Sequence, residues 1–481
     1  MPPHHTSSIA STSNRDVLII GGGLAGLAAA AGLAEQEIKV TLLESRPRLG
    51  GRASSFLDHE TGMSIDNCQH VVMGCCTNYF HFCQTIGVDN LFRTEKELYF
   101  IASDNQVNRF ASGLLPAPFH LMNAFRKLSY LSHADGKILA KALRALMKVN
   151  ASYEQEHSFA DWLQQQKQPS HLIDRFWQVV LVSALSESLD RIDIGHARKV
   201  FFDGFLAHRK GWEVSMPTVP LNELYGDKMQ NWFQQHQTTI QLQTGVEKLL
   251  FAENKITGAL LRSGAVISAS EYILAVPHHL VTSLLPEELM QHSDLAGINQ
   301  LETAPISSVH LWFDRPITPL PHAVLIDRLG QWMFNRTEIL KQSAKPSDVQ
   351  NGYCYQVIIS ASHALRQQSS EEIIQTIRHE LEEIWSLTKG AKLLHSRLVT
   401  DHRAVFSPLP GVEKLRPSQQ SPVANLQLAG DWTETGWPAT MEGAVRSGYL
   451  AAENALHRMG YSAKLLQPDL RASWLARILF G

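Results

Sequence analysis

Short runs of aliphatic and β-branched residues, each closed by turn residues, recur along this chain of 481 residues. The first run is 16–20 (DVLII), followed by a glycine-rich turn at 21–26 (GGGLAG) and a small-residue segment at 28–34. A second run, 39–44 (KVTLLE), comes next. Continuous apolar runs of this length predict strands buried on both faces, and the small residues between them predict a closely packed helix. The order strand, helix, strand predicts a βαβ unit in a parallel sheet.

The rest of the chain divides into blocks of different periodicity. Residues 255–277 alternate apolar and polar positions between turn residues, which predicts a meander of short strands ending at 272–277. The block from about 95 to 215 is rich in helical patterns, and the block from about 300 to 400 contains further strands. The segments that illustrate these two blocks are 137–149 and 170–189 for helices, and 306–313, 331–334 and 354–362 for strands.

Composition and charge narrow the class of protein. Hydrophobic residues make up 44% and charged residues 19%, an ordinary globular composition, and this length predicts two domains. The formal net charge of −3 predicts no nucleic-acid partner. Residues 1–14 are polar and lack an apolar core, so we interpret them as a disordered tail and not as a signal peptide. No run of 18 apolar residues occurs, so we expect a protein that is soluble or lies on a membrane surface.

Five cysteines occur, and four of them lie between residues 68 and 83. An odd, clustered set does not resemble a secreted disulfide framework. The spacing of Cys75, Cys76 and Cys83 also fits no zinc pattern. We therefore expect reduced, partly buried thiols, no bound metal and a cytoplasmic location.

Gly21, Gly23 and Gly26 have the GxGxxG spacing of a dinucleotide-binding turn. Gly21 allows the tight turn, Gly23 lets the backbone approach a pyrophosphate, and Gly26 lets helix and strand pack closely. The N-terminus of the helix offers free N–H groups to the phosphates. Glu44, at the end of the second strand, can accept hydrogen bonds from ribose hydroxyls and would repel a 2′-phosphate. The turn alone leaves NAD and FAD open.

A second glycine pair decides between these cofactors. Residues 46–52 (RPRLGGR) follow Glu44 closely and add another close backbone approach together with fixed positive charge for the phosphates of a long cofactor. NAD enzymes do not need this addition. The two motifs together resemble the GG-doublet flavoprotein superfamily, which includes amine oxidases, phytoene desaturases and protoporphyrinogen oxidases. This resemblance implies FAD.

In that superfamily the chain returns to the FAD-binding domain twice, and two segments here resemble those returns. By resemblance, the backbone at Val246 touches the adenine. Residues 428–432 (LAGDW) and 438–448 (PATMEGAVRSG) resemble the last return, in which a strand ends at Asp431 and a helix beginning near Ala439 or Thr440 points its N-terminus at the flavin. That edge of the flavin becomes negative on reduction, which the helix dipole stabilises.

Covalent attachment of the flavin needs a cysteine, histidine or tyrosine at the right place. Residues 404–456 contain no cysteine and no histidine, and their one tyrosine, Tyr449, lies well inside the expected helix. We therefore expect FAD to be bound non-covalently.

The superfamily resemblance implies an α/β fold, with a Rossmann-type FAD-binding domain and a substrate domain of helices and a mixed sheet, as in flavin amine oxidases. The expected FAD-binding domain is discontinuous and comprises 15–95, 215–300 and 400–460; the substrate domain comprises 96–214 and 301–399, and 464–481 is an amphipathic C-terminal helix. The candidate cofactor-binding residues are Gly21, Gly23, Leu24, Ala25, Gly26, Glu44, Ser45, Arg46, Gly50, Gly51, Arg52, Gln69, His70, Val246, Gly430, Asp431, Ala439, Thr440 and Met441.

A narrower resemblance, from about residue 16 to residue 456, is to the squalene-associated FAD-dependent desaturase family, better described as hydroxysqualene dehydroxylases. That family commonly has a glycine where Cys68 stands and an acid where Asn335 stands. The blocks that carry the resemblance are 66–74 (DNCQHVVMG), 330–334 (GQWMF), 355–360 (YQVIIS), 402–406 (HRAVF) and 430–448.

The narrower resemblance implies a reaction in which hydroxysqualene loses its hydroxyl and reduced flavin supplies a hydride, giving squalene, a C30 isoprenoid. Such a reaction needs a long apolar channel, an acid for the leaving hydroxyl and exclusion of water. The candidate acids are His70, Glu434 and Glu442, which lie on segments expected at the flavin. Two of them have structural alternatives, since His70 can bond to the backbone and Glu442 can brace a helix.

Three other functions stay open at this point. A carotenoid-type desaturase would take a similar polyene precursor and remove hydrogens. An amine oxidase usually has a lysine on a substrate-domain strand, which the matching segment 306–310 lacks, although Trp432 and Trp437 could form its aromatic walls. A non-catalytic flavin-binding subunit of a lipid-synthesis complex is the alternative from another class.

Two apolar features bear on membrane contact. Residues 114–131 are rich in leucine and aromatic residues. The C-terminus has Leu470, Trp474, Leu475, Ile478 and Leu479 at helical spacing beside two arginines, which predicts either an anchor on the inner face of the membrane or a helix that packs on protein. No second dinucleotide motif is visible, so we expect a separate electron donor. The oligomeric state and the downstream pathway, whether hopanoid, sterol or carotenoid, stay open.

Overall fold

A parallel five-stranded sheet forms one half of the computed structural model, which describes residues 15–149, 157–341 and 352–480. The expected tail at 1–14 lies outside the described residues. Neighbouring strands pair in parallel throughout this sheet. In spatial order they are β10 (Thr238–Gln241), β2 (Lys39–Leu43), β1 (Asp16–Ile20), β14 (Glu271–Leu274) and β20 (Leu426–Leu428). The sheet therefore takes strands from three distant parts of the sequence.

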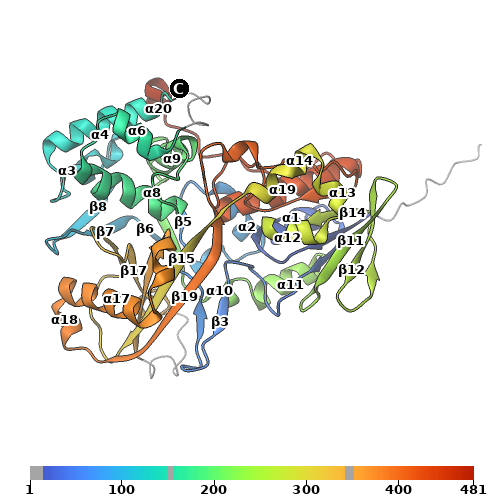
Figure 1. Cartoon of the computed structure of the whole chain (residues 1–481), viewed down its shortest axis with the longest axis horizontal. Helices are drawn as coiled ribbons and strands as arrows, with labels where there is room; N and C mark the ends of the chain where they lie inside the picture. Colours follow the sequence, from blue (N-terminus) through green and yellow to red (C-terminus); the bar gives the residue numbers. More distant parts are fainter. Residues whose placement is uncertain (1–14, 150–156, 342–351, 481) are drawn as a thin grey trace, which may run out of the picture.

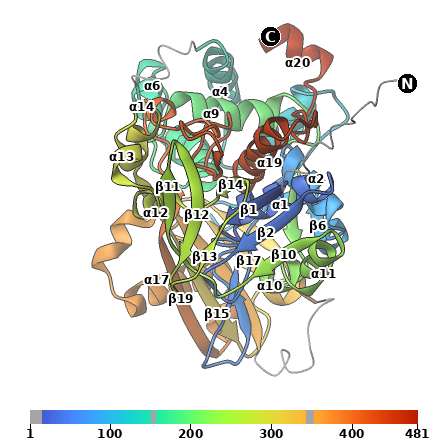
Figure 2. The same cartoon turned by 90° about the vertical axis from the view of Figure 1, so that its right-hand side faces the viewer.

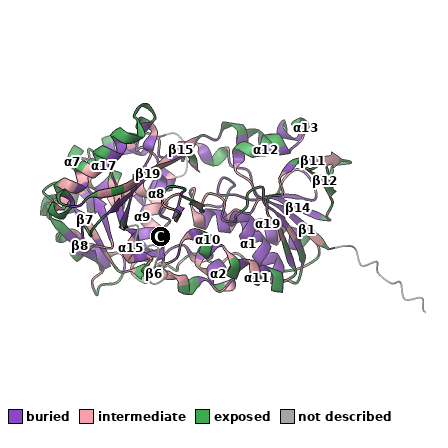
Figure 3. Cartoon of the chain, turned by 90° about the horizontal axis from the view of Figure 1, so that it is seen from below, coloured by how far each residue is buried: buried purple, intermediate pink, exposed green. Residues whose placement is uncertain are grey.

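Two helices of small residues pack against each other beside this sheet (Figure 3). The predicted βαβ helix is α1 (Leu24–Ala34), in which every residue is buried. The helix predicted near residue 440 is α19 (Met441–Arg458). A Cβ atom at Gly448 of α19 would lie 2.1 Å from the carbonyl oxygen of Ala25, so only glycine permits this close approach. The packing brings the N-termini of both helices to the same edge of the sheet.

The expected meander is a separate antiparallel sheet. Its strands are β11 (Val246–Ala252), β12 (Lys255–Leu261) and β13 (Val266–Ile267), which pair in that order. The next strand of the segment, β14, leaves the meander and pairs with β1 and β20 in the parallel sheet.

A seven-stranded mixed sheet forms the other half of the molecule (Figure 1). Its pairs are antiparallel except for the parallel pair of β16 and β7. The predicted α/β class, with a parallel Rossmann-type sheet and a mixed sheet, is confirmed. The strands are β19 (Leu393–Phe406), β15 (Thr303–Phe313), β18 (Tyr353–Ser360), β17 (Trp332–Asn335), β16 (His322–Leu325), β7 (Glu97–Ile101) and β8 (Val107–Ala111).

Helices lie on both faces of the mixed sheet. One side carries α17 (Ser370–Ile384), whose buried isoleucines and Leu381 pack under the strands. The other side carries a group of helices with its own aromatic core (Figures 1 and 2). This group comprises α3 (Met122–Arg126), α4 (His133–Leu146), α6 (Phe159–Gln165), α7 (Ser170–Leu172), α8 (Gln178–Leu185) and α9 (Ile194–Phe201).

Short elements connect the two halves. The segment after β1–α1–β2 forms the hairpin of β3 (Ser55–Leu57) with β4 (Ser64–Asp66), and then α2 (Thr77–Thr85). A small sheet of β5 (Val72–Met73), β9 (Val214–Pro217) and β6 (Phe92–Glu95) follows between the halves. This places residues 66–76 between the parallel sheet and the helical group.

The C-terminal helix is shorter than the predicted 464–481. Helix α20 covers only Trp474–Phe480, and residues 462–473 run over the surface without regular structure. Pro468 cannot continue a helix, and side chains bind the backbone N–H groups of this segment. The Leu465 and Leu466 N–H groups donate to Glu453 at 2.6 and 2.8 Å. Within the described residues, none of the helices is both long and apolar enough to cross a bilayer.

Candidate functional site

A cavity of about 660 Å³ lies where β1, β2, β14 and β20 end, at the carboxyl edge of the parallel sheet. We call it the cofactor cavity. Ligands of α/β proteins bind at this edge of the sheet. Every candidate cofactor-binding residue named from the sequence lines the cavity, except Gly26.

Gly26 does not line the cavity, and its role is to allow the backbone to pack closely. A Cβ atom at Gly26 would lie 2.0 Å from the carbonyl oxygen of Gly21. Gly21 itself has φ +113°, a conformation that favours glycine. These two glycines close the tight turn between β1 and α1, so their role is to shape the loop.

Gly23 differs from its neighbours because the protein itself does not require a glycine there. Its φ of −77° suits any residue, and the nearest atom to an added Cβ is the Cα of Gly51, at 3.9 Å. Gly23 caps α1 without a side-chain hydrogen bond, and the first turn of α1 has no acidic residue. Open space at uncapped N–H groups fits a phosphate group. This chain is therefore suited to hold the pyrophosphate of FAD.

The second glycine pair lies directly against the first turn. The Gly50 N–H donates to the carbonyl oxygen of Gly22 at 2.9 Å, and Gly51 has φ +62°. A Cβ atom at Gly51 would lie 3.0 Å from the Cα of Gly23. The two glycine motifs thus form one wall of backbone around the proposed phosphate position.

Glu44 has local partners as well as a place in the cavity. Its carboxylate accepts hydrogen bonds from the Gly22 N–H and the Arg46 N–H, both at 2.7 Å. The side chain is buried, and the two bonds fix its orientation at the end of β2. The oriented carboxylate retains lone pairs for ribose hydroxyls.

Arg52 joins the N-terminal and C-terminal parts of the cavity. Its guanidinium forms an ion pair with Asp431 at 2.5 Å and donates to the carbonyl oxygen of Ala404 at 2.8 Å. Burial opposes the charge, but the Asp431 carboxylate outweighs it and raises the pKa of Arg52. Arg52 is therefore always charged and positions Asp431.

The N-terminus of α19 faces the cofactor cavity. Thr440 caps the helix by accepting a hydrogen bond from the Gly443 N–H at 3.0 Å. The Ser447 hydroxyl of the same helix accepts from the Gly430 N–H at 2.8 Å, which ties β20 to α19. This arrangement can hold the positive end of the α19 dipole at the flavin ring.

Several lining residues were not anticipated from the sequence. Arg262 lies against Gly245 at the mouth of the cavity, and Asp401 and Ile306 reach it from β19 and β15. No local motif marks these residues, because sheet pairing alone brings them to the cavity. Cys68 also lines it, and burial raises the pKa of its thiol to about 12, so it stays protonated.

A second cavity, of about 280 Å³, adjoins the first, and we call it the apolar cavity. Aromatic and aliphatic side chains dominate its wall, among them Leu98, Phe100, Phe110, Trp212 and Trp332. Both cavities are lined by Gln69, Val71, Thr440 and Met441. The two spaces therefore meet at the N-terminus of α19, the position proposed for the flavin ring.

Two single-turn π-helices contribute to the wall of the apolar cavity. They are η3 (Ile173–Trp177), between α7 and α8, and η4 (Phe202–Leu206), after α9. Arg175 and Phe176 of the first, and Asp203, Gly204 and Phe205 of the second, line the cavity. Such π-turns inside helices are frequent at functional sites. The helical segment expected at 170–189 thus consists of α7, η3 and α8 and ends at Leu185.

Of the three candidate acids, His70 lies in the cofactor cavity. Its Nδ1 is 3.0 Å from the carbonyl oxygen of Cys68, which accepts the ring proton. Burial lowers the pKa of His70, so the imidazole is neutral at neutral pH. His70 is thus placed for hydrogen bonding but is a weak proton donor.

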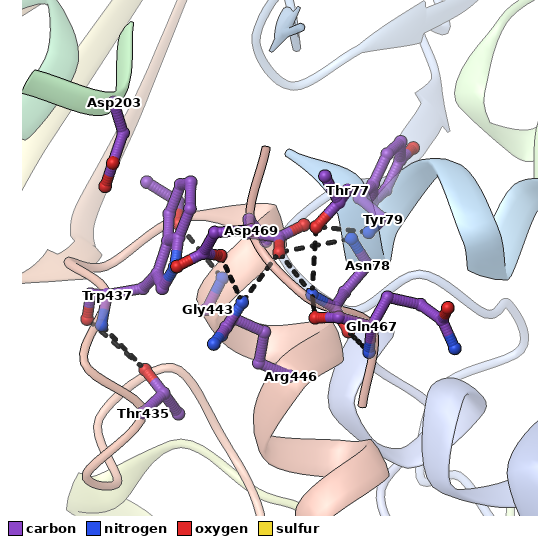
Figure 4. Close-up of polar contacts among 12 residues, drawn as sticks. Thr77, Asn78, Tyr79, Asp203, Thr435, Trp437, Gly443, Arg446, Gln467 and Asp469 are labelled. Carbon is purple, nitrogen blue, oxygen red and sulfur yellow. Dashed lines mark hydrogen bonds and ion pairs between the residues drawn. The ribbon is translucent and has the colours of Figure 1, made fainter. Parts of the chain in front are cut away.

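Glu442 braces α2. Its carboxylate is completely buried and accepts from the Asn78 and Tyr79 N–H groups at 3.2 and 2.8 Å and from the Asn78 side chain at 2.8 Å (Figure 4). Burial raises its pKa against these hydrogen bonds. The carboxylate caps the N-terminus of α2 from another helix, as the structural alternative predicts.

Glu434 lies outside both cavities. Its side chain is exposed, although its neighbours Thr433 and Thr435 are buried. The structure therefore does not bring Glu434 to the cofactor cavity, contrary to the expectation from the sequence.

The geometry disfavours an amine site. Trp432 lines the cofactor cavity and donates its indole N–H to the Val276 carbonyl oxygen at 2.9 Å, whereas Trp437 lines the apolar cavity. The two rings therefore line different cavities. Strand β15, the position expected for an amine oxidase lysine, reaches the cofactor cavity through Ile306.

Known families and proteins are similar to most of this chain. The family model described as "Flavin containing amine oxidoreductase" matches residues 24–456. A 15-cis-phytoene desaturase of an Oncidium hybrid cultivar is 26% identical over 478 residues, covering 91% of this chain and 77% of that protein. A probable zeta-carotene desaturase of Synechococcus elongatus is 26% identical over 485 residues, covering 93% of this chain and all (100%) of that protein.

Solved structures share the fold at lower identity. An oxidoreductase from Methanosarcina mazei has a TM-score of 0.69 at 17% identity, covering 90% of this chain and 98% of that one. Cyclohexylamine oxidase from Brevibacterium oxydans also has a TM-score of 0.69, at 16% identity, covering 93% of this chain and 100% of that one. At this identity the likeness establishes the fold alone.

Proposed function

The chain belongs to the flavin-containing amine oxidoreductase family, and we propose that within it the protein reduces hydroxysqualene to squalene with FAD as its non-covalent cofactor. Membership of the family makes the protein an FAD-dependent oxidoreductase, distantly related to carotenoid desaturases. The substrate and the direction of the reaction are the proposal. The observation that carries it is the apolar cavity that meets the cofactor cavity beside Thr440 and Met441.

The substrate class follows from the wall of that cavity. Its aromatic and aliphatic surface suits a hydrocarbon chain, which gains about 25 cal/mol for each Å² removed from water. The two similar curated proteins are named as carotenoid desaturases, and the blocks DNCQH and GWPATMEGAVRSG of this chain resemble the dehydroxylases. A hydroxylated C30 isoprenoid is consistent with the apolar wall and with both of these similarities.

The chain's own residues would divide the work as follows. Gly23, Gly50 and Gly51 would approach the pyrophosphate, Glu44 the ribose, Val246 the adenine, and Asp431 the ribityl side; all six line the cofactor cavity. The N-terminus of α19 stabilises negative charge on the flavin ring. When bound, reduced FAD supplies the hydride equivalent. The apolar wall excludes water, which prevents trapping of an electron-poor carbon.

The same proposal includes a discontinuous FAD-binding domain at 15–95, 215–300 and 400–460, with the substrate domain at 96–214 and 301–399. The distribution of the parallel-sheet strands over three parts of the chain supports it. We also propose a separate reductase or small carrier as electron donor.

Anaerobic reduction tests the proposed reaction. We expect protein reduced by dithionite, then freed of excess reductant, to convert about one hydroxysqualene to squalene for each FAD oxidised. The measurement is the return of flavin absorbance, with product analysis of the same sample. If the flavin stays reduced and no squalene forms, while an amine or a carotene precursor reduces the oxidised protein, the proposal fails in favour of an oxidase or a desaturase.

Contact with an anionic membrane surface is a further part of the proposal. The side chains of Leu114, Trp474 and Ile478 are 98%, 60% and 71% exposed, and Leu115 and Phe119 are also exposed. Hydrogen bonds hold the two segments together: the Ser473 hydroxyl donates to the Ala117 carbonyl oxygen at 2.6 Å. Exposed arginines at 471 and 477 add the positive charge that anionic lipid attracts.

Helix α20 also packs on the protein. Ala476 is completely buried, and Phe480 packs against the aromatic core of the helical group. The outer face, with Trp474 and Ile478 one turn apart, has no such neighbour among the hydrophobic clusters of the described residues. Packing fixes the helix and leaves this face for lipid.

The double change Leu114→Asp and Ile478→Asp should weaken binding to phosphatidylglycerol vesicles by at least about 10-fold, because two apolar contacts are lost and two negative charges are added. Vesicle co-sedimentation measures the effect. Val266→Asp is the matched control, since Val266 is 52% exposed on β13, in the separate meander sheet, and should not change binding. Equal sedimentation of the double variant and the unaltered protein would show that this surface does not bind lipid.

A further inference from the structure

One part of the apolar cavity is charged. Lys199 near the end of α9 and Asp203 in η4 both line this cavity, and the Lys199 Nζ lies 2.7 Å from the Asp203 carboxylate. Their side chains are only 23% and 19% exposed. Desolvation makes such a pair no better for stability than apolar residues of similar size. An ion pair in the wall of a cavity for hydrocarbon therefore points to a polar group on the ligand.

The surroundings place Lys199 close to the junction of the two cavities. Its Nζ lies 4.5 Å from the centre of the Trp437 ring, and Trp437 is three residues before Thr440, which lines both cavities. Asp203 follows Lys199 by four residues, the spacing at which helical side chains meet, so its carboxylate lies one turn after the lysine. Lys199 thus presents its ammonium group at the end of the apolar cavity nearest α19.

Other charged groups around Lys199 are already paired. Arg446 of α19 binds Asp469 at 2.7 Å and Glu442 at 3.5 Å, and Asp469 lies 3.9 Å from the Lys199 Nζ. Figure 4 shows Asp203, Trp437, Arg446 and Asp469 gathered beside the first turns of α19. Asp469 brings the C-terminal segment into the same cluster.

Glu442 also lines the apolar cavity, and burial raises the pKa of its carboxyl group. Both of its carboxylate oxygens already accept hydrogen bonds, one from the Asn78 N–H groups and the other from the Tyr79 N–H, so neither oxygen is free to present a proton to a ligand.

Three other polar residues of this cavity are poorer proton donors than a lysine. Arg175 is paired with Asp327 at 2.9 Å, and an arginine does not give up its proton in proteins. Burial raises the pKa of Tyr130, and the neighbouring Cys75 thiol and burial raise that of Cys76. Among the described residues that line this cavity, Lys199 is the cation with a transferable proton.

We propose that Lys199 is the catalytic proton donor to the leaving hydroxyl, held in position by Asp203. The inference rests on the proposed dehydroxylation. The carbon–oxygen bond breaks with its electron pair on oxygen, and the Lys199 proton converts the departing hydroxyl to water. Bound reduced FAD would supply the hydride equivalent that the carbon needs and would be oxidised in doing so. Lys199 regains its proton from solvent at the exposed side of the cluster.

The substitutions Lys199→Arg and Lys199→Met separate proton donation from a structural ion pair. Arginine keeps the charge and the pairing with Asp203, but it cannot release a proton. Methionine removes both. We expect both variants to lower the single-turnover rate of squalene formation by roughly 10²–10⁴-fold, the range typical of general acid catalysis. Lys141→Met on the exposed face of α4 is the matched control and should keep the full rate.

A binding measurement adds a readout that is independent of turnover. Titration of the oxidised holoprotein, followed by flavin absorbance, gives the affinities for hydroxysqualene and squalene. Lys199→Met should weaken hydroxysqualene binding by roughly 10-fold, the loss of one hydrogen bond to a charged donor, and leave squalene binding unchanged. Lys199→Arg should bind both ligands normally.

The outcomes distinguish this inference from the function on which it rests. If the unaltered protein forms squalene and Lys199→Arg does so at a similar rate, the lysine supplies only charge and its role as proton donor is refuted. If Lys199→Met also retains the rate, Lys199 has no part in the reaction. If the unaltered protein itself forms no squalene, the proposed function fails first.

Discussion

Replacing Gly23 with valine should give a folded protein that no longer retains FAD. The backbone at Gly23 suits any residue, and the protein leaves an added Cβ free of close contacts. The space that valine would fill is the space proposed for the pyrophosphate. We expect the affinity for FAD to fall by about 10³-fold, which corresponds to roughly 4 kcal/mol.

Two measurements check this result. Acid precipitation should release all flavin of the unaltered protein into the supernatant, as expected for a non-covalent cofactor, and almost none from Gly23→Val. The thermal midpoint of Gly23→Val should equal that of the unaltered protein after removal of FAD, because a ligand stabilises only the state that binds it. Flavin that stays in the pellet would contradict non-covalent binding.

Gly26 and Gly136 provide contrasting controls. Gly26→Val should destabilise the fold itself, since its Cβ would overlap the Gly21 carbonyl oxygen at 2.0 Å. Gly136, on the surface of α4, has no atom within 4 Å of an added Cβ, so Gly136→Val should keep the cofactor. Full flavin content in Gly23→Val would mean that the pyrophosphate lies elsewhere.

The elements around the cofactor cavity could be predicted from the sequence because the residues that form each of them are close together in the chain. Strand β1, the glycine turn, α1 and β2 follow one another within residues 16–43, and each has a distinct composition. The turn requires glycine for steric reasons that are visible in the spacing alone. The end of β20 and the start of α19 are similarly marked by Asp431, Thr440 and the small residues that follow.

The substrate side depended on contacts that sequence patterns do not encode. The π-turns η3 and η4 both contribute to the wall of the apolar cavity, but the helical pattern of 170–189 does not indicate the first of them. The C-terminal segment is held by Glu453 and Asn78, which are distant in sequence from Leu465 and Gln467. Such contacts decide where polar groups enter the apolar cavity.

Arg336 is the clearest example of a residue whose role depends on contacts with residues that are distant in the sequence. It begins α15 (Arg336–Ile339), directly after β17, and its guanidinium binds the Asp66 carboxylate at 2.5 Å. It also donates to the side-chain oxygen of Gln69, which lines both cavities. Asn335, where the dehydroxylase family commonly has an acid, caps this helix by accepting from the Glu338 N–H at 3.1 Å. Arg336 therefore links the mixed sheet to the segment that borders the flavin.

Arg336→Met should lower the free energy of unfolding of the holoprotein by about 3–5 kcal/mol, because it leaves a buried carboxylate without its partner. The side chains of Arg336 and Asp66 are 7% and 2% exposed, so water cannot replace the lost interaction. Denaturant unfolding measures the change. The rate of flavin reduction or reoxidation by substrate should also fall, since Gln69 loses the group that orients it.

The double variant Arg336→Met with Asp66→Asn separates charge from packing. Removing the unpaired charge should recover part of the lost free energy of unfolding. The Ser55 hydroxyl and the Leu221 N–H donate to Asp66 at 2.7 and 2.9 Å, and asparagine at this position still offers them a polar side chain. If the double variant is as unstable as the sum of both single variants, the two residues act independently and the ion pair does not carry the effect. Recovery of stability without recovery of rate would assign Arg336 a second role, the positioning of Gln69 at the junction of the two cavities.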